Sequence, residues 1–268
     1  MKKIVFVMIC TALATVTFGQ GKDARQQKKE ERKEKINQLI KQEEEGALIY
    51  QKQSIFGIKL TTDGYGAFYE LGKLKTPVKT NLFGIELGER KSPKEEKLTR
   101  GNSYGFAIGN PYIYGKINNF YYAKVGIGQQ RLIGGKGNKN GVAVSALYGG
   151  GLSAGLLKPY YIRVTGSGGG STTQDIKYSN NDDVFLGATG ITGAAGVGKG
   201  FNEMKFVPGA FAKTALRFDY GRYNESITAI EVGVNVEAYT KKMPIMLLNK
   251  NRQLFFNAYA ALVFGKRK

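Results

Sequence analysis

One segment of the chain has the spacing of a phosphate-binding loop. Glycines and a lysine recur from Gly193 to Lys199, but Gly200 stands where such a loop carries a Ser or Thr to coordinate magnesium. The chain holds 37 glycines, so matches of this kind arise by chance. We therefore expect no nucleotide or other cofactor to bind here, and interpret 134–141, a second glycine and lysine segment, as a turn between strands.

Other residue types exclude whole classes of chemistry. The 268 residues include no histidine and one cysteine, so histidine bases, histidine metal sites and Ser/His or Cys/His nucleophiles cannot be built. A catalytic carboxylate pair, Glu231 and Glu237, is conceivable, but Lys213 and Arg217 offer a simpler explanation as balancing charges. The sequence thus predicts no enzyme, with no catalytic, metal or cofactor residues.

The N-terminus has the layout of a secretory signal peptide over residues 1–19. A basic start precedes an apolar stretch from Ile4, and Gly19 is a small residue at the expected cleavage site. The apolar stretch is shorter than the roughly 18 residues of a membrane helix. Cleavage would remove Cys10, which Ile9 makes a poor lipidation site, and would leave a mature chain without disulfides.

The next segment, residues 20–52, is dense in charge. Residues 22–45 hold 8 basic and 7 acidic side chains with no Gly or Pro, and the spacing of Glu31 and Lys35 favours a helix. We expect a short charged periplasmic helix. It is either a solvated spacer or a docking site for a partner.

The positive charge belongs to the body of the chain. The formal charge is +19, and 30 basic against 14 acidic residues remain after the first 45 residues are set aside. A basic exported protein meets anionic lipid headgroups or polysaccharide, and no motif points to nucleic acid. We expect outer-membrane lipid, including anionic headgroups, as a partner and no nucleic acid.

From about residue 53 the chain alternates with period two, which indicates β-strands. In 226–240 one face is apolar and the other carries Glu231, Asn235 and Glu237. A hairpin through 221–225 would place Arg217 opposite Glu231, and an Asp63-Gly64 turn would bring Lys59 near Glu70. The charges expected on the polar faces are Lys59, Glu70, Glu86, Lys213, Arg217, Glu231 and Glu237.

Such strands suit either a soluble sandwich or an antiparallel transmembrane outer-membrane β-barrel with these charges in its lumen. The export signal, the 16 Tyr and 15 Phe, and an alternating strand at 254–264 favour the barrel, over residues 53–268. About eleven candidate segments are visible, and an even number is needed, so we expect 8–12 strands, with eight or ten favoured. The uncertain regions are 141–164, with its triple glycine, and 183–200; 90–101 and 165–182 are candidate external loops.

Several stretches resemble the small outer-membrane β-barrel proteins of Bacteroidota. They are 115–122, 128–141, 148–160, 200–205 and the terminal Phe-Gly-Lys-Arg-Lys. The resemblance implies a location in the outer membrane and no catalytic residue; by analogy, it allows partnership with an envelope assembly such as type IX secretion. We expect a non-enzymatic structural or accessory envelope protein. The alternatives are a small passive channel and a soluble exported β-sandwich that binds polyanions.

Overall fold

The computed structural model describes residues 30, 50–99, 110–137, 141–165, 173–179, 185–186, 190–221 and 225–268. The predicted signal peptide and, apart from Glu30, the predicted helix at 22–45 lie outside the described residues. Within the described part of the chain, no helix is long and apolar enough to cross a membrane.

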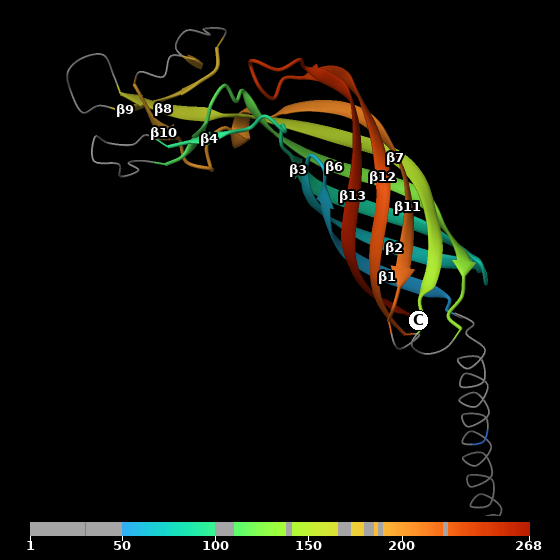
Figure 1. Ribbon diagram of the computed structural model, residues 1–268. Coiled ribbons are helices and arrows are strands. Elements are labelled where there is room, and N and C mark those ends of the chain that lie inside the picture. The colour runs from blue at the N-terminus through green and yellow to red at the C-terminus, as the bar shows by residue number, and fades with distance from the viewer. Residues whose placement is uncertain are drawn as a thin grey trace, which may run out of the picture. The chain divides into compact units, whose positions relative to one another are not determined.

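Eight antiparallel strands close into a barrel (Figure 1), in the order β1-β13-β12-β11-β7-β6-β3-β2. The all-β barrel expected from the alternation is therefore confirmed, and the sandwich architecture is wrong because the sheet closes on itself. The strands are β1 (Lys52–Thr61), β2 (Gly64–Thr76), β3 (Lys79–Arg90), β6 (Asn118–Gly134), β7 (Ala143–Pro159), β11 (Lys205–Asp219), β12 (Ser226–Met243) and β13 (Arg252–Arg267).

In the described residues, five shorter strands lie outside the barrel, and they explain why the sequence shows more than eight candidate segments. A three-stranded sheet in the β7–β11 connection contains β8 (Tyr161–Thr165), β9 (Thr173–Lys177) and β10 (Ile191–Ala194), and η1 (Phe201–Glu203) follows it. The other pair is β4 (Lys97–Leu98) and β5 (Tyr112–Ile113), in the β3–β6 connection. The uncertain region 183–200 thus holds β10, and the candidate loop at 165–182 holds β9.

The uncertain triple glycine, 149–151, lies within one continuous strand, β7. Sheet neighbours approach it closely: a Cβ on Gly151 would overlap the Val125 carbonyl oxygen, and a Cβ on Gly126 would lie 2.7 Å from the Phe211 ring. Glycine is needed at these positions because the facing strand leaves no space for a side chain. The run is therefore a close contact between β6 and β7, not a turn.

The strand register fixes the width of the barrel. Following paired residues from Lys52 once around all eight strands leads to Thr62, ten residues further along β1. This stagger sets the strand tilt, and eight strands leave an interior just wide enough for side chains to fill. The register alone therefore predicts a packed interior.

The first hairpin differs by one residue from the sequence prediction. Thr61 pairs with Gly64, so its two loop residues are Thr62 and Asp63 instead of Asp63 and Gly64. The shift has a physical reason, since it directs the Asp63 carboxylate to the guanidinium of Arg90, which lies at the end of β3.

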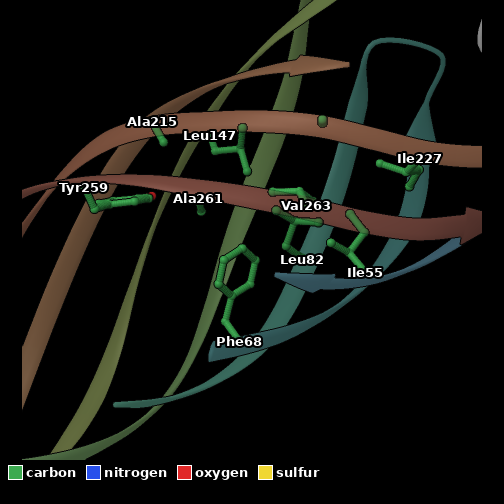
Figure 2. Close-up of a cluster of buried hydrophobic side chains, with 10 residues drawn as sticks. Ile55, Phe68, Leu82, Leu147, Ala215, Ile227, Tyr259, Ala261 and Val263 are labelled. Atoms are coloured by element: carbon green, nitrogen blue, oxygen red, sulfur yellow. The ribbon is translucent and has the colours of Figure 1, made fainter. Parts of the chain in front are cut away.

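An apolar cluster fills the barrel toward the end that holds the short 76–79 turn and the start of β1. Ile55, Leu82, Ile227 and Val263 lie near the corresponding strand ends and are at most 6% exposed. Figure 2 shows their side chains converging from different strands, with Phe68, Leu147 and Tyr259 beside them. This cluster closes one end of the interior.

Candidate functional site

The interior of the barrel, from its middle to the strand ends, contains a balanced set of buried charges. Six acidic and six basic side chains form ion pairs with one another on the inner face of the described strands and the first hairpin. The acids are Asp63, Glu70, Glu86, Asp219, Glu231 and Glu237, and the bases are Lys59, Arg90, Lys124, Lys213, Arg217 and Arg267. Because a buried charge is costly unless it is paired, this balance is a condition for the barrel to close.

Arg217 is the centre of the first charge cluster. Its Nε donates to Glu231 Oε2 at 2.9 Å, and its Nη2 lies 2.6 Å from Glu70 Oε2. Lys213 Nζ reaches the other oxygen of Glu70 at 2.6 Å, and the Tyr259 hydroxyl donates to Glu231 Oε1 at 2.7 Å. Both carboxylates are thus bound on both oxygens, and Arg217 is only 2% exposed.

A second cluster is built on Glu86 and Glu237. Glu86 Oε1 lies 2.6 Å from Lys59 Nζ and 2.9 Å from Lys124 Nζ. Lys124 also binds Glu237, whose other oxygen accepts from the Tyr239 hydroxyl at 2.8 Å. Lys124 therefore joins two acids that belong to different strands, β3 and β12.

Arg90 links this second cluster to the first hairpin and to nearby aromatic rings. Its guanidinium pairs with Glu237 and with Asp63 in the β1–β2 hairpin, and it lies 5.2 Å from the centre of the Phe255 ring and 5.3 Å from that of Tyr122. Such stacking of an arginine on aromatic rings is favourable where water is excluded. One side chain thus connects a turn, two strands and an aromatic cluster.

That aromatic cluster closes the other end of the interior. Phe120 is fully buried, and its ring centre lies 5.4 Å from those of Tyr239 and Phe255. The remaining members lie near the strand ends that lead to the longer connections: Tyr122, Leu157, Val207 and Met243. The charge clusters are therefore enclosed between two apolar clusters.

Little space remains among these charges. A void of about 30 Å³ is lined by residues that include Glu70, Glu86, Lys124 and Lys213. A space of that size accommodates about one or two water molecules. The ion pairs around this void are thus closely packed.

The structure brings all seven charges predicted from the sequence into this interior. It places Arg217 directly opposite Glu231, the pairing expected from the hairpin, and Lys213 diagonal to Glu237. Lys59 and Glu70, expected to be neighbours, bind other partners: Lys59 pairs with Glu86, and Glu70 with Lys213 and Arg217. In β1 and β2 the two residues lie four positions out of register, so Lys59 meets a charge on β3 and Glu70 meets charges on β11, across the barrel.

Sequence reasoning missed several members of the clusters. Arg90, assigned to a loop, is the last residue of β3 and is 1% exposed. Lys124 could have been found, because β6 alternates from Phe120 through Tyr122 to Lys124 on one face. Asp63 and Arg267 carry no such signal, since each lies at the end of an alternating stretch.

The three-stranded sheet outside the barrel carries its own charge cluster. Asp175 on β9 accepts from Arg163 Nε at 2.8 Å and also pairs with Lys199. The hydrogen bond from Arg163, followed by that from Lys199, lowers the pKa of Asp175 to about 2. Lys199 belongs to the segment with phosphate-loop spacing, and its ammonium here binds a carboxylate. The segment leads into a three-residue 3₁₀ turn, η1, in place of the long helix of a phosphate-binding loop.

Comparison with known proteins gives only remote likenesses. No protein-family model and no curated protein sequence matches the chain. Among solved structures, the attachment invasion locus protein Ail of Yersinia pestis is 9% identical with a TM-score of 0.36, covering 82% of this chain and 100% of that one. Neisserial surface protein A is 8% identical with a TM-score of 0.34, covering 80% and 92%.

A further likeness is to the N-terminal β-barrel domain of Pseudomonas aeruginosa OprF, with 9% identity, a TM-score of 0.33, and 81% and 99% of the two chains covered. At these values the likenesses carry no functional argument. The fold rests on the strand register described above.

Proposed function

We propose that this chain is a non-enzymatic integral β-barrel protein of the outer membrane, a structural or accessory component of the cell envelope. The observation that carries the proposal is the inverted polarity of the barrel. Twelve charged side chains are paired inside the barrel, whereas large apolar side chains of the same strands are exposed on its outer face. Such a molecule suits hydrocarbon as its surroundings.

The outward-facing side chains support this environment in detail. Ile127 is 73% exposed, Leu152 75% and Phe256 69%, and these residues belong to three different strands, β6, β7 and β13. A soluble protein rarely leaves a continuous apolar surface of this kind in water. The barrel strands of 10 to 18 residues are also long enough, because a tilted membrane strand needs about 9 to 11.

The lengths of the connections support one orientation. At one barrel end the strands are joined across 77–78, 135–142 and 220–225, and β1 begins and β13 ends there. At the other end the connections include 91–117 and 160–204, which contain the small additional sheets. Outer-membrane barrels keep short turns in the periplasm and longer loops outside. On this orientation the sheet of β8, β9 and β10 is external.

The same orientation assigns a place to the N-terminal segment. The segment expected at 20–52 leads into β1, which begins at Lys52. It would lie in the periplasm, where a helix at 22–45 can contact an envelope or secretion-complex protein. The signal peptide at 1–19, this docking role and the likeness to Bacteroidota barrels remain hypotheses based on sequence.

A passive channel is the weaker alternative, because paired charges and two apolar clusters fill the interior. Single-channel recordings of the purified protein in planar bilayers separate the two. We expect no stepwise conductance, and steady open events would favour the channel.

The proposed location is tested by fractionation combined with heat-modifiable gel mobility. A closed membrane barrel should be recovered with outer membranes and migrate differently before and after boiling. Recovery as a monodisperse protein in buffer without detergent would refute the proposed function.

A further inference from the structure

Four basic residues on the outer face of the barrel oppose one another across strand pairs. Lys52 lies directly opposite Lys73 on β1 and β2, and Lys79 lies directly opposite Arg131 on β3 and β6. All four point outward, because their strand neighbours Gln53, Gly72, Thr80 and Gln130 are buried. Like charges directly opposite one another destabilise a sheet.

These four side chains lack an ion-pair partner within the part of the chain that the structure describes. None of them takes part in an ion pair among the described residues, whereas the charges inside the barrel are paired. In the described barrel strands, the outward-facing acid is Glu89, at the opposite end of β3. No described residue supplies the compensating charge, and an anion that binds to the outer face can supply it.

The location of the two pairs indicates where that charge comes from. Both lie near the barrel end with short turns, which the proposed orientation places in the periplasmic leaflet. Lys75 and Lys266 are exposed at the same end and add to the positive field. Phosphates of lipid headgroups are the anions available at that depth.

A groove lies beside the Lys52–Lys73 pair on the outer face. It has a volume of about 820 Å³ and runs from β1 to β7. Its lining includes Leu71, Phe83 and Ile127, which are 45 to 73% exposed, together with both lysines. The groove thus combines a cationic end with an apolar wall, as an acyl chain with an acidic headgroup requires.

Polar side chains form a ladder across the same groove. Gln129 Nε2 donates to Asn81 Oδ1 at 3.3 Å, and the Tyr148 hydroxyl donates to Gln129 Oε1. In the register these residues continue the row that starts at Lys52 and Lys73. Amide donors here can bind the ester carbonyls that link a headgroup to its acyl chains.

We propose that this groove binds one anionic glycerophospholipid of the periplasmic leaflet. Lys52, Lys73, Lys79 and Arg131 hold the phosphodiester, and an acyl chain lies along the apolar wall. A zwitterionic lipid fits less well, since its own ammonium already neutralises the phosphate. This inference rests on the membrane location proposed above.

The test is native mass spectrometry of the full chain extracted from vesicles of phosphatidylcholine with a minor fraction of phosphatidylglycerol. We expect preferential retention of phosphatidylglycerol by the native chain. The double variant Lys52→Gln, Lys73→Gln should retain at least about fivefold less, since each cation near the surface contributes roughly that factor. The matched control is Lys241→Gln, Lys242→Gln. It changes two exposed lysines on β12 at the barrel end with the longer connections, and it should retain as much phosphatidylglycerol as the native chain.

A second variant tests the charge argument independently. Lys73→Glu places opposite charges across β1 and β2, so the pair no longer needs a lipid phosphate. The thermal midpoint of the native barrel should rise as phosphatidylglycerol is added, and that of Lys73→Glu should stay constant.

Equal retention of both lipids by the native chain, or equal losses in the two double variants, would overturn the inference. Heat-modifiable mobility of every variant separates the two proposals. Barrels that insert without lipid preference would refute the lipid site alone, whereas a native chain that does not insert would refute both.

Discussion

Arg217 and Glu231 lie directly opposite each other on β11 and β12, and Arg217 also binds Glu70 from across the barrel. The pair therefore serves two purposes: it fixes the register of one hairpin and joins that hairpin to β2. Both side chains are at most 2% exposed. Changes at these positions should affect closure of the barrel as well as local stability.

Reversing the charge of this pair gives the first prediction. Arg217→Glu removes the cation shared by Glu70 and Glu231 and adds a third carboxylate beside them. Breaking a buried pair costs about 3–5 kcal/mol, so folding should fail or be strongly impaired. Adding Glu231→Arg should restore folding only partly, because the carboxylate introduced on β11 still faces Glu70. The refolding yield of the single and the double variant is measured by heat-modifiable gel mobility. If Glu231→Arg gave no rescue, the assigned register of β11 and β12 would be wrong.

The aromatic cluster gives a second prediction. Phe120→Ala removes a fully buried ring and should lower the free energy of unfolding by about 3–5 kcal/mol, as measured by urea titration in vesicles. Bilayer conductance should stay absent, since the ion pairs of Arg90, Lys124 and Glu237 still fill the interior. The control Phe56→Ala changes a ring that is 48% exposed on the outer face and should cost much less. Conductance in Phe120→Ala would show that this cluster alone seals the lumen.

The close glycine contact between β6 and β7 gives a third prediction. A Cβ on Gly151 would overlap a backbone oxygen of β6, so Gly151→Ala must displace a strand and should destabilise the barrel by roughly 1–3 kcal/mol. Gly134→Ala is the matched control, because its Cβ would meet nothing within 4 Å. Urea midpoints of the two variants provide the comparison, and equal midpoints would contradict the close approach of the strands.

The external sheet should respond to acid through Asp175. Its pKa in the folded protein is about 2, below the ordinary value of 3.8, so its ion pairs stabilise the sheet above about pH 3.8. That contribution is lost as the pH falls from about 3.8 to 2. Amide hydrogen exchange in β8 and β9 should therefore accelerate over this range, relative to exchange in β12. In Asp175→Asn, exchange in β8 and β9 should already be faster at neutral pH and should not accelerate further as the pH falls from about 3.8 to 2. If exchange still accelerated over that range, another group would be responsible for the acid effect.

Much of the barrel could be predicted from the sequence, because alternation with period two specifies both the strand and its two faces. Glu231, Asn235 and Glu237 alternate with valines, and this pattern alone identifies the buried face of β12. The short 220–225 connection also determines the pairing of β11 with β12. Local information is sufficient wherever strands are joined by a tight turn.

The features that the sequence does not predict depend on which strands pair around the barrel, and alternation carries no information about that pairing. Glu86 meets Lys124 through the β3–β6 pairing, across a long connection with its own small strands. Short segments such as β8 and β9 have strand-like sequences yet pair outside the barrel, so the number of strands could not be fixed. Arg90 looked like a loop residue because its partners, Asp63 and Glu237, are remote in the sequence.

The pairing of β1 with β13 has a kinetic consequence. Gln53 pairs with Arg267, so closing this seam joins residues separated by almost the whole described barrel. Contacts of such long range form slowly, because most of the chain must first be ordered. Until β13 arrives, β1 and β12 each present an open row of peptide groups, which the hydrocarbon of the membrane proposed above does not tolerate. Membrane insertion and closure of the barrel should therefore occur together and late in folding, when β13 pairs with β1.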